Sequence, residues 1–452
     1  MLSILCPRRI LFLIPVFFLF VISFQIRAEA ATKPNIIYVM ADDLGYGDLG
    51  CYGQKVIQTP HIDQLAKEGM RFTSHYSGHT VCRPSRLVLL TGQHSGHTPI
   101  SQNEQYVFPT GTTTVTTLLK EAGYTTGGVG KWALGLPQTS GVPSQQGFDF
   151  WFGYLDQGNA HNYYPEYLWK NEQKVVLPGN KIGPQKRVSV NRETYSHDLL
   201  TREAFQFIRQ NANRPFFLQA HYTIPHANNE GGRAVNDGME VPEYGIYADK
   251  DWPTPEKGFA AMITRLDRDM GTLVALLKEL KQEDNTVIFF TSDNGPHQEG
   301  NHKVEFFNSN GPLRGYKRDL YEGGIRVPLI VKWPGKIKPD TTTDHISAFW
   351  DFLPTACDLA GVESPQNIDG ISYLPTLLGQ PQPTHESLYW KYRGKEALRE
   401  GQWKAVRTGP NKPLELYNLE TDIGEQQNVA DQHPKIATRL QQQMKQSQTT
   451  SD

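Results

Sequence analysis

The sequence predicts an α/β protein with a large, mostly parallel sheet, followed by a small C-terminal α+β subdomain with an antiparallel sheet. Two observations support this prediction. Up to about residue 344, apolar runs typical of buried strands alternate with helical patterns, which indicates a parallel sheet covered by helices on both faces. From about His345 onward, the pattern changes to short strands and a terminal helix.

The strands of the parallel sheet are predicted from short apolar runs. Residues 35–40 (NIIYVM) form one such run, which ends abruptly in two aspartates. A run of this length without alternation is typical of a strand buried on both faces. The same reasoning predicts strands at residues 125–129, 216–220, 286–291 and 327–331.

The helices are predicted from their end signals and their periodicity. Thr59 is a suitable N-cap, Pro60 fits the first helical position, and Gly69 is a typical stop signal. Further helices are expected at residues 115–122, 193–210 and 259–281. The C-terminal part is expected to contain a helix at 352–360, strands at 388–392, 403–407 and 414–418, and a last helix at 436–445.

The N-terminal thirty residues have the pattern of a secretory signal peptide. Arg8 and Arg9 precede an apolar run over residues 10–24, and a small-x-small cleavage site follows at Ala28-Glu29-Ala30. The run is short for a membrane span. We therefore expect an exported protein, periplasmic or secreted, with no stable membrane insertion after the signal is removed.

Composition excludes some partners. The formal net charge at pH 7 is -2, so the chain has no basic field typical of nucleic-acid binding, and we expect no nucleic-acid partner. The length of 452 residues is enough for two or three domains.

Two pairs of oxygen-bearing side chains follow predicted strands. Asp42 and Asp43 come after the strand at 35–40, and Asp293 and Asn294 after the strand at 286–291. Ligands bind at the carboxyl ends of parallel strands, and hard oxygen donors suit Ca²⁺ or Mg²⁺. Alternatively, such dipeptides form turns and helix caps without binding anything. Taken alone, the pairs leave both interpretations open.

The segment from Cys82 to Gly92 reads C-R-P-S-R-L-V-L-L-T-G. It resembles the signature of the type I sulfatases, a family within the alkaline phosphatase-like superfamily, and the likeness extends over residues 35–429. In that family a maturation enzyme oxidises the cysteine to Cα-formylglycine (3-oxoalanine), whose hydrated aldehyde is the nucleophile. The resemblance implies an alkaline phosphatase-like α/β/α sandwich, with a catalytic domain at 31–344 and a C-terminal subdomain at 345–452.

The resemblance also implies roles for individual residues. One Ca²⁺ would be held by the two oxygen pairs together with residue 82, and Arg86, one helical turn after Cys82, would hold the formylglycine. Lys131 and Lys317 would bind the sulfate group, and His226 would protonate the leaving oxygen.

One position departs from the family pattern. Many sulfatases carry G-K-W-H-L-G, in which the histidine takes a proton during sulfate release, but this chain has Ala133 there. His161, in an Asn- and Tyr-rich segment, is our candidate substitute, and His297 is a second one. After signal removal three cysteines remain; if Cys82 is converted, a disulfide between Cys51 and Cys357 is an option.

The expected function is the removal of sulfate from a sulfated poly- or oligosaccharide. An alternative is a formylglycine-dependent phosphonate or phosphate ester hydrolase of the same superfamily. A third interpretation, which Ala133 keeps open, is a non-catalytic carbohydrate-binding relative.

Overall fold

The structure is a computed structural model that describes residues 2–3 and 33–448. Its framework is a ten-stranded sheet. Its strand order is β13-β2-β12-β11-β1-β10-β4-β5-β6-β7. The central strands β11 to β5 of this order all run parallel, whereas β12 and β6 pair antiparallel with them. The parallel strands are β11 (Thr286–Ser292), β1 (Asn35–Ala41), β10 (Phe216–His221), β4 (Thr125–Lys131) and β5 (Phe150–Tyr154). The outer strands are β13 (Thr341–Thr343), β2 (Met70–Phe72), β12 (Leu329–Lys332), β6 (Tyr167–Lys170) and β7 (Gln173–Val176).

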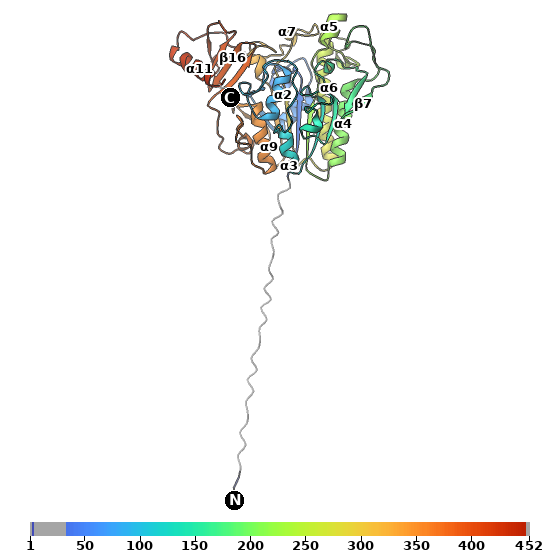
Figure 1. Cartoon of the computed structure of the whole chain (residues 1–452), viewed down its shortest axis with the longest axis vertical. Helices are drawn as coiled ribbons and strands as arrows, with labels where there is room; N and C mark the ends of the chain where they lie inside the picture. Colours follow the sequence, from blue (N-terminus) through green and yellow to red (C-terminus); the bar gives the residue numbers. More distant parts are fainter. Residues whose placement is uncertain (1, 4–32, 449–452) are drawn as a thin grey trace. The chain divides into compact units, whose positions relative to one another are not determined.

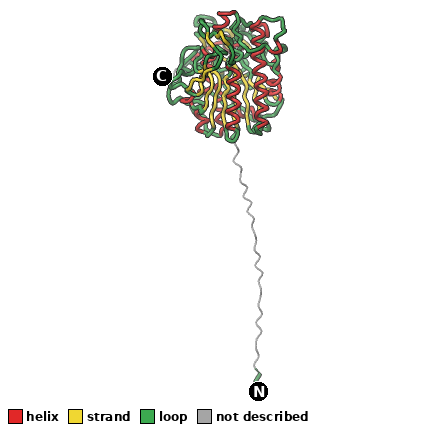
Figure 2. Tube along the Cα trace, turned by 90° about the vertical axis from the view of Figure 1, so that its right-hand side faces the viewer, coloured by secondary structure: helices red, strands yellow, loops and turns green. Residues whose placement is uncertain are grey.

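Helices cover both faces of this sheet (Figure 1), and Figure 2 shows the same layers from the side. Successive side chains of β1 point to opposite faces: Ile36 and Tyr38 pack into one apolar core, Ile37 and Val39 into the other. The first core is covered by α2 (Cys82–Thr91), α3 (Val115–Glu121) and α9 (Phe352–Ala360). The second is covered by α1 (Pro60–Lys67), α4 (Ser196–Asn211) and α6 (Thr254–Glu279).

The C-terminal part contains a separate four-stranded antiparallel sheet, as predicted. Helix α11 packs on this sheet, where Leu440 and Met444 are buried against Tyr389 and Leu416 (Figure 1). Its strands are β15 (Leu388–Tyr392), β16 (Lys395–Glu400), β17 (Trp403–Arg407) and β18 (Glu415–Asn418), and the helix is α11 (Pro434–Gln446). The remaining elements are β3 (His75–Tyr76), β8 (Lys181–Ile182), β9 (Ser189–Asn191), β14 (Ser347–Ala348), α5 (Asn229–Val235), α7 (Val304–Phe307), α8 (Glu322–Ile325) and α10 (Leu374–Leu377).

Most predicted elements are present, and the differences have local causes. Thr59 precedes α1, but its side chain does not cap the helix because its hydroxyl instead accepts a hydrogen bond from the backbone N of Gly50 (2.8 Å). Strand β16 was not predicted because its sequence, KEALRE, is mostly charged. The suggested disulfide is wrong, since Cys51, Cys82 and Cys357 are free thiols.

Apart from residues 2–3, the predicted signal peptide lies outside the described residues. Within residues 2–3 and 33–448, no helix is both long enough and apolar enough to cross a membrane.

A buried charge cluster fastens the C-terminal sheet to α8. Lys404 of β17, fully buried, places its ammonium nitrogen 2.8 Å from Glu322 Oε1 and 3.0 Å from Glu425 Oε1. Glu322 also accepts a hydrogen bond from the Tyr76 hydroxyl (2.6 Å) and pairs with Arg326 (2.9 Å). Burial raises the pKa of Glu425 to about 7 although Lys404 opposes this rise. The lysine is therefore the main cation that makes two buried carboxylates tolerable.

Replacing Lys404 by Met should lower the free energy of unfolding by about 3–5 kcal/mol, because removing one partner strands a buried charge. Chemical denaturation of the variant and the parent measures this loss. Lys412→Met, at an exposed position, is the control and should change stability by less than about 0.5 kcal/mol. Equal losses in the two variants would contradict the role given to Lys404.

Candidate active site

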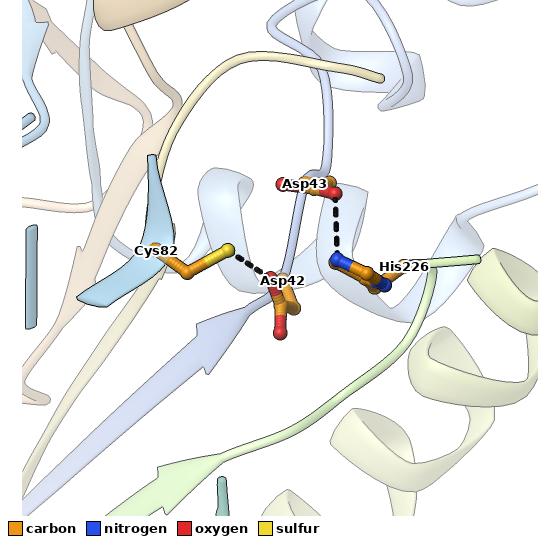
Figure 3. Close-up of side chains that lie close together, drawn as sticks. All are labelled: Asp42, Asp43, Cys82 and His226. Atoms are coloured by element: carbon orange, nitrogen blue, oxygen red, sulfur yellow. Dashed lines mark hydrogen bonds and ion pairs between the residues drawn. The ribbon is translucent and has the colours of Figure 1, made fainter. Parts of the chain in front are cut away.

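The two oxygen-bearing pairs and the cysteine meet at one edge of the sheet, as the sequence predicted. Asp42 and Asp43 directly follow β1, and Asp293 and Asn294 directly follow β11, its parallel neighbour. Cys82 is the first residue of α2. All five side chains are fully buried. Figure 3 shows the Cys82 thiol directed at Asp42, with Asp43 close to His226.

Asp42 is the carboxylate next to the cysteine. The Cys82 Sγ donates to Asp42 Oδ1 at 3.3 Å (Figure 3). On the other oxygen, Asp42 Oδ2 lies 2.6 Å from Lys131 Nζ and 3.4 Å from Arg86 Nη2. Burial alone would raise the pKa of Asp42, but Lys131, His226 and Arg86 hold it well below its usual value.

Asp43 contacts Asp293, Asn294 and Lys317. Its backbone lies in the left-handed region (φ 67°), and its amide N donates to Asp293 Oδ1 at 3.1 Å. The Asp43 carboxylate accepts a hydrogen bond from Asn294 Nδ2 (2.6 Å) and pairs with Lys317 Nζ (2.7 Å). The turn after β1 is thus bonded to the turn after β11, which fixes the positions of their oxygen atoms.

Arg86 links helix α2 to the segment after β11 and to the end of β4. Its guanidinium lies 2.8 Å from Asp293 Oδ2 and donates to the backbone O of Lys131 (2.9 Å). Burial and the neighbouring Asp42 raise the pKa of Asp293 to about 7, although Arg86 acts in the opposite direction. The carboxylates are therefore crowded, and a further cation among them would relieve their repulsion.

The donor set fits a hard cation. The Asn294 Oδ1 is buried and has no hydrogen-bond partner, while the Nδ2 of the same side chain donates to Asp43 (2.6 Å) and the Asp43 amide N donates to Asp293 Oδ1 (3.1 Å). Ligand atoms of Asp42, Asp43, Cys82 and His226 lie within 4.8 Å of one another. Oxygen ligands of this kind suit Ca²⁺.

Cys82 itself is a poor nucleophile as a thiol. Burial and the adjacent Asp42 carboxylate raise its pKa far above the usual value, although Lys131 acts in the opposite direction. Since the thiolate is the reactive form of cysteine, this shift disfavours attack by an unmodified Cys82.

His226 faces the site through one ring nitrogen. Its Nδ1 donates to the backbone O of Ala227 (2.7 Å), and its Nε2 lies 3.1 Å from Lys317 Nζ and 3.5 Å from Asp43 Oδ2. Figure 3 shows this approach to Asp43. Burial, then Lys317, lower the pKa of His226 well below its usual value. The neutral imidazole thus turns Nε2 toward the centre.

A family model described as Sulfatase matches residues 34–362, well over half of the chain. The chain belongs to the sulfatase family. Residues 315–450 also match a model described as N-sulphoglucosamine sulphohydrolase, C-terminal. The protein is a sulfuric ester hydrolase.

Known sulfatases resemble the chain over nearly its whole length. An N-acetylgalactosamine-6-O-sulfatase of Bacteroides thetaiotaomicron is 30% identical over 91% of this chain and 92% of its own. Arylsulfatase A of Homo sapiens is 32% identical over 91% of this chain and 87% of its own. A crystal structure of Ps i-CgsB in complex with k-i-k-neocarrahexaose has a TM-score of 0.78 and 30% identity, covering 92% of both chains. The expected alkaline phosphatase-like fold is confirmed.

In this sulfatase, position 133, where the family pattern led us to expect a histidine, carries no acid or base. Ala133 adopts a left-handed backbone (φ 67°). Its amide N donates to Leu155 O (3.1 Å), and its carbonyl accepts from Arg83 Nε (2.7 Å). The residue contributes only backbone hydrogen bonds and a methyl group.

The two candidate substitutes differ in their surroundings. The His161 ring stacks on His226, with centroids 4.9 Å apart, and its Nδ1 lies 3.1 Å from Glu230 Oε2. His297 has backbone partners on both ring nitrogens, Pro225 O on Nε2 (3.0 Å) and Glu299 N on Nδ1 (3.0 Å). His297 therefore has no nitrogen left for substrate, whereas the Nε2 of His161 is not used by its bond to Glu230.

Sequence reasoning missed Glu299, which contacts the sulfatase's Lys317 at 3.1 Å. No local pattern distinguishes this glutamate from others in the chain, because Lys317 follows it by 18 residues and comes close only through the fold.

A second group of side chains that could hold a metal is His94, His97 and Asp369, beyond the C-terminal end of α2. The His94 Nδ1 accepts a hydrogen bond from the backbone N of Gly96 (2.9 Å). In the neutral ring the proton is then on Nε2, the atom facing Asp369. That nitrogen lies 3.8 Å from Asp369 Oδ1, too far for a hydrogen bond. Asp369 is bound instead by the His94 backbone N (2.8 Å) and by His97 Nδ1 (2.9 Å), and these contacts account for the group.

Calcium should raise the thermal unfolding midpoint of the chelator-treated sulfatase. A ligand at about a hundred times its Kd stabilises the native state by about 2.7 kcal/mol. Differential scanning fluorimetry with and without Ca²⁺ measures the shift. Asp293→Asn should lose most of it, whereas Asp358→Asn, at an exposed position of α9, should retain it. An undiminished shift in Asp293→Asn would show that the cation binds elsewhere.

Proposed function

We propose that this sulfatase removes sulfate from a sulfated poly- or oligosaccharide. Two comparisons support this substrate class: the relative named N-acetylgalactosamine-6-O-sulfatase and the similar structure solved with neocarrahexaose. The observation that carries the proposal is the placement of Cys82, whose Sγ lies 3.3 Å from Asp42 in a buried site that also contains Lys131, Lys317 and His226.

The proposal includes two groups that the chain must acquire. A formylglycine-generating enzyme would convert Cys82 to 3-oxoalanine, and addition of water to this aldehyde would give the hydrate, one hydroxyl of which would attack sulfur. One Ca²⁺ held by residue 82, Asp42, Asp43, Asp293 and Asn294 would polarise the sulfuryl group and favour the deprotonated nucleophile.

The cationic side chains of the site would bind and orient the sulfate ester. Lys131 and Lys317 are buried, and each pairs with a different aspartate: Lys131 Nζ lies 2.6 Å from Asp42 Oδ2 and Lys317 Nζ 2.7 Å from Asp43 Oδ2. Fixed cations that face a group gaining charge in the transition state are among the strongest catalytic devices. Arg86, bonded to Asp293 and to the backbone of Lys131, would hold residue 82 in place.

His226 would donate the proton to the departing alcohol oxygen. Its Nδ1–H is occupied by Ala227 O (2.7 Å), so only Nε2 can exchange a proton with substrate. A bound sulfate ester brings negative charge close to Nε2, and nearby negative charge favours the imidazolium form. General acids of this kind contribute about 10²–10⁴-fold in rate.

His161 would take the proton in the step that frees sulfate, the role that Ala133 cannot fill. Its ring lies against His226, and its bond to Glu230 (3.1 Å) orients it. A carboxylate on one ring nitrogen makes the other nitrogen a better base. Glu230 is itself held by Arg187 Nη1 (3.2 Å), so the arrangement is braced from outside the site.

We further propose that the chain is exported, periplasmic or secreted, after loss of residues 1–30. Its catalytic domain would comprise residues 31–344 and its C-terminal subdomain residues 345–452. In this proposal the mature chain has no stable membrane insertion and no nucleic-acid partner.

The purified, formylglycine-bearing protein should release sulfate from an aryl sulfate over many turnovers and should cleave an aryl phosphate at least about a hundredfold more slowly, a preference of about 2.7 kcal/mol. Ion chromatography of free sulfate and phosphate measures both rates. A preference for the phosphate would support the phosphonate or phosphate ester hydrolase instead. Carbohydrate binding with no sulfate release would support the non-catalytic relative.

His161→Ala should slow sulfate release more than alcohol release. In a rapid-mix experiment with saturating nitrophenyl sulfate, the variant should show an initial burst of nitrophenol and a steady rate about 10²-fold or more below the parent. His61→Ala, at an exposed position of α1, should behave as the parent. An unchanged steady rate in His161→Ala would dismiss this role.

A further inference from the structure

Lys317 has three close partners, and the proposed reaction gives no role to one of them, Glu299. The Lys317 Nζ lies 2.7 Å from Asp43 Oδ2, 3.1 Å from His226 Nε2 and 3.1 Å from Glu299 Oε2. An ammonium group has three N–H donors, so these contacts occupy all of them. Lys317 can therefore turn a donor toward a sulfate oxygen only when one partner gives way.

Of the three partners, Glu299 is the one best suited to keep its contact with Lys317 when sulfate binds. Asp43 belongs to the proposed cation-binding set, and His226 must exchange a proton with the leaving oxygen. Glu299 has neither task, and its Oε2 lies 3.7 Å from His226 Nε2, within the same cluster. It can thus hold the Lys317 ammonium group beside the histidine throughout a turnover.

The surroundings of Glu299 fix its carboxylate. Its backbone N donates to His297 Nδ1 (3.0 Å), and the His297 Nε2 donates to Pro225 O (3.0 Å). Its second oxygen, Oε1, pairs with the guanidinium of Arg318. Burial would raise the pKa of Glu299, but Lys317, then His226, hold it below its usual value, so the group is ionised.

The position of Glu299 also affects how tightly the site binds anions. Its side chain is 11% exposed and lies between Lys317, which is 2% exposed, and Arg318, which is 48% exposed. A negative charge beside two cations weakens the attraction of both for a sulfate ion, since charges a few ångströms apart interact strongly in a protein interior. Without it, the product would be held more tightly while the reaction gained nothing.

We propose that Glu299 is a positioning residue that holds the Lys317 ammonium beside His226 Nε2 and, by its charge, keeps the site from binding the sulfate product too tightly. This inference rests on the proposed sulfate-binding role of Lys317. It separates two properties of one side chain: the hydrogen bond that places Lys317, and the charge that opposes the anion.

Two substitutions separate these properties. Glu299→Gln keeps an acceptor for Lys317 but removes the charge, and Glu299→Ala removes both. Both variants should bind inorganic sulfate about tenfold more tightly than the parent. The kcat with nitrophenyl sulfate should fall about 10- to 100-fold in Glu299→Ala, because a misplaced catalytic group is costly, and should fall less in Glu299→Gln. Glu305→Ala, on the exposed face of α7, is the control and should match the parent in both measurements.

Isothermal titration calorimetry gives the sulfate affinity independently of turnover. Unchanged sulfate affinity in both variants would overturn the inference, as would equal losses of kcat in Gln and Ala. If Glu299→Ala does not fold, the sulfate affinity of Glu299→Gln decides alone. A parent that binds sulfate but releases none from the aryl ester would contradict the proposed function and not the role of Glu299.

Discussion

The structure of the site depends on the balance of charge in a buried space. Asp42, Asp43 and Asp293 lie together at the carboxyl ends of neighbouring strands, where water cannot solvate them. Buried charges are tolerable only when they are paired and hydrogen-bonded. The three carboxylates form ion pairs with Arg86 of α2, with Lys131 at the end of β4 and with Lys317 of a loop. Each cation is therefore held in a fixed place before any substrate arrives.

The same balance explains why the thiol is unsuited to the reaction. The pKa of Cys82 is raised because burial, and then the Asp42 carboxylate, disfavour the negatively charged thiolate. An oxygen nucleophile bound to a divalent cation would instead lie beside positive charge, which would stabilise its deprotonated form. The side chains that would bind an anion and the one that would protonate an alcohol are already in place around residue 82. The proposed modification supplies the group that this environment can activate.

The sequence predicted the centre of the fold better than its periphery. Strands β1, β10 and β11 are continuous apolar runs, and they position Asp42, Asp43, Asp293 and Asn294 as expected. By contrast, β16 buries only Ala397 and Leu398 as apolar residues and is otherwise charged, so its sequence carries little strand pattern. The glycine-rich β4 was predicted too short; at Gly130 (φ 101°) a side chain would collide with the backbone O of His221. Packing against neighbours, which a single sequence does not reveal, decides such positions.

The site likewise contains residues that the sequence predicts and residues that it does not. Cys82 and the residues around it stand in a long local motif, whereas Glu299 and Glu230 belong to no such motif, and their partners, 18 and 69 residues away, come close only through the fold. The central claim is that residue 82 acts as an aldehyde-derived nucleophile. Mass spectrometry of the peptide containing residues 81–86, combined with the sulfate-release rate of the same preparation, tests it most directly. We predict that activity rises in proportion to the fraction of aldehyde at position 82. Full activity in a preparation whose residue 82 is entirely thiol would contradict the account.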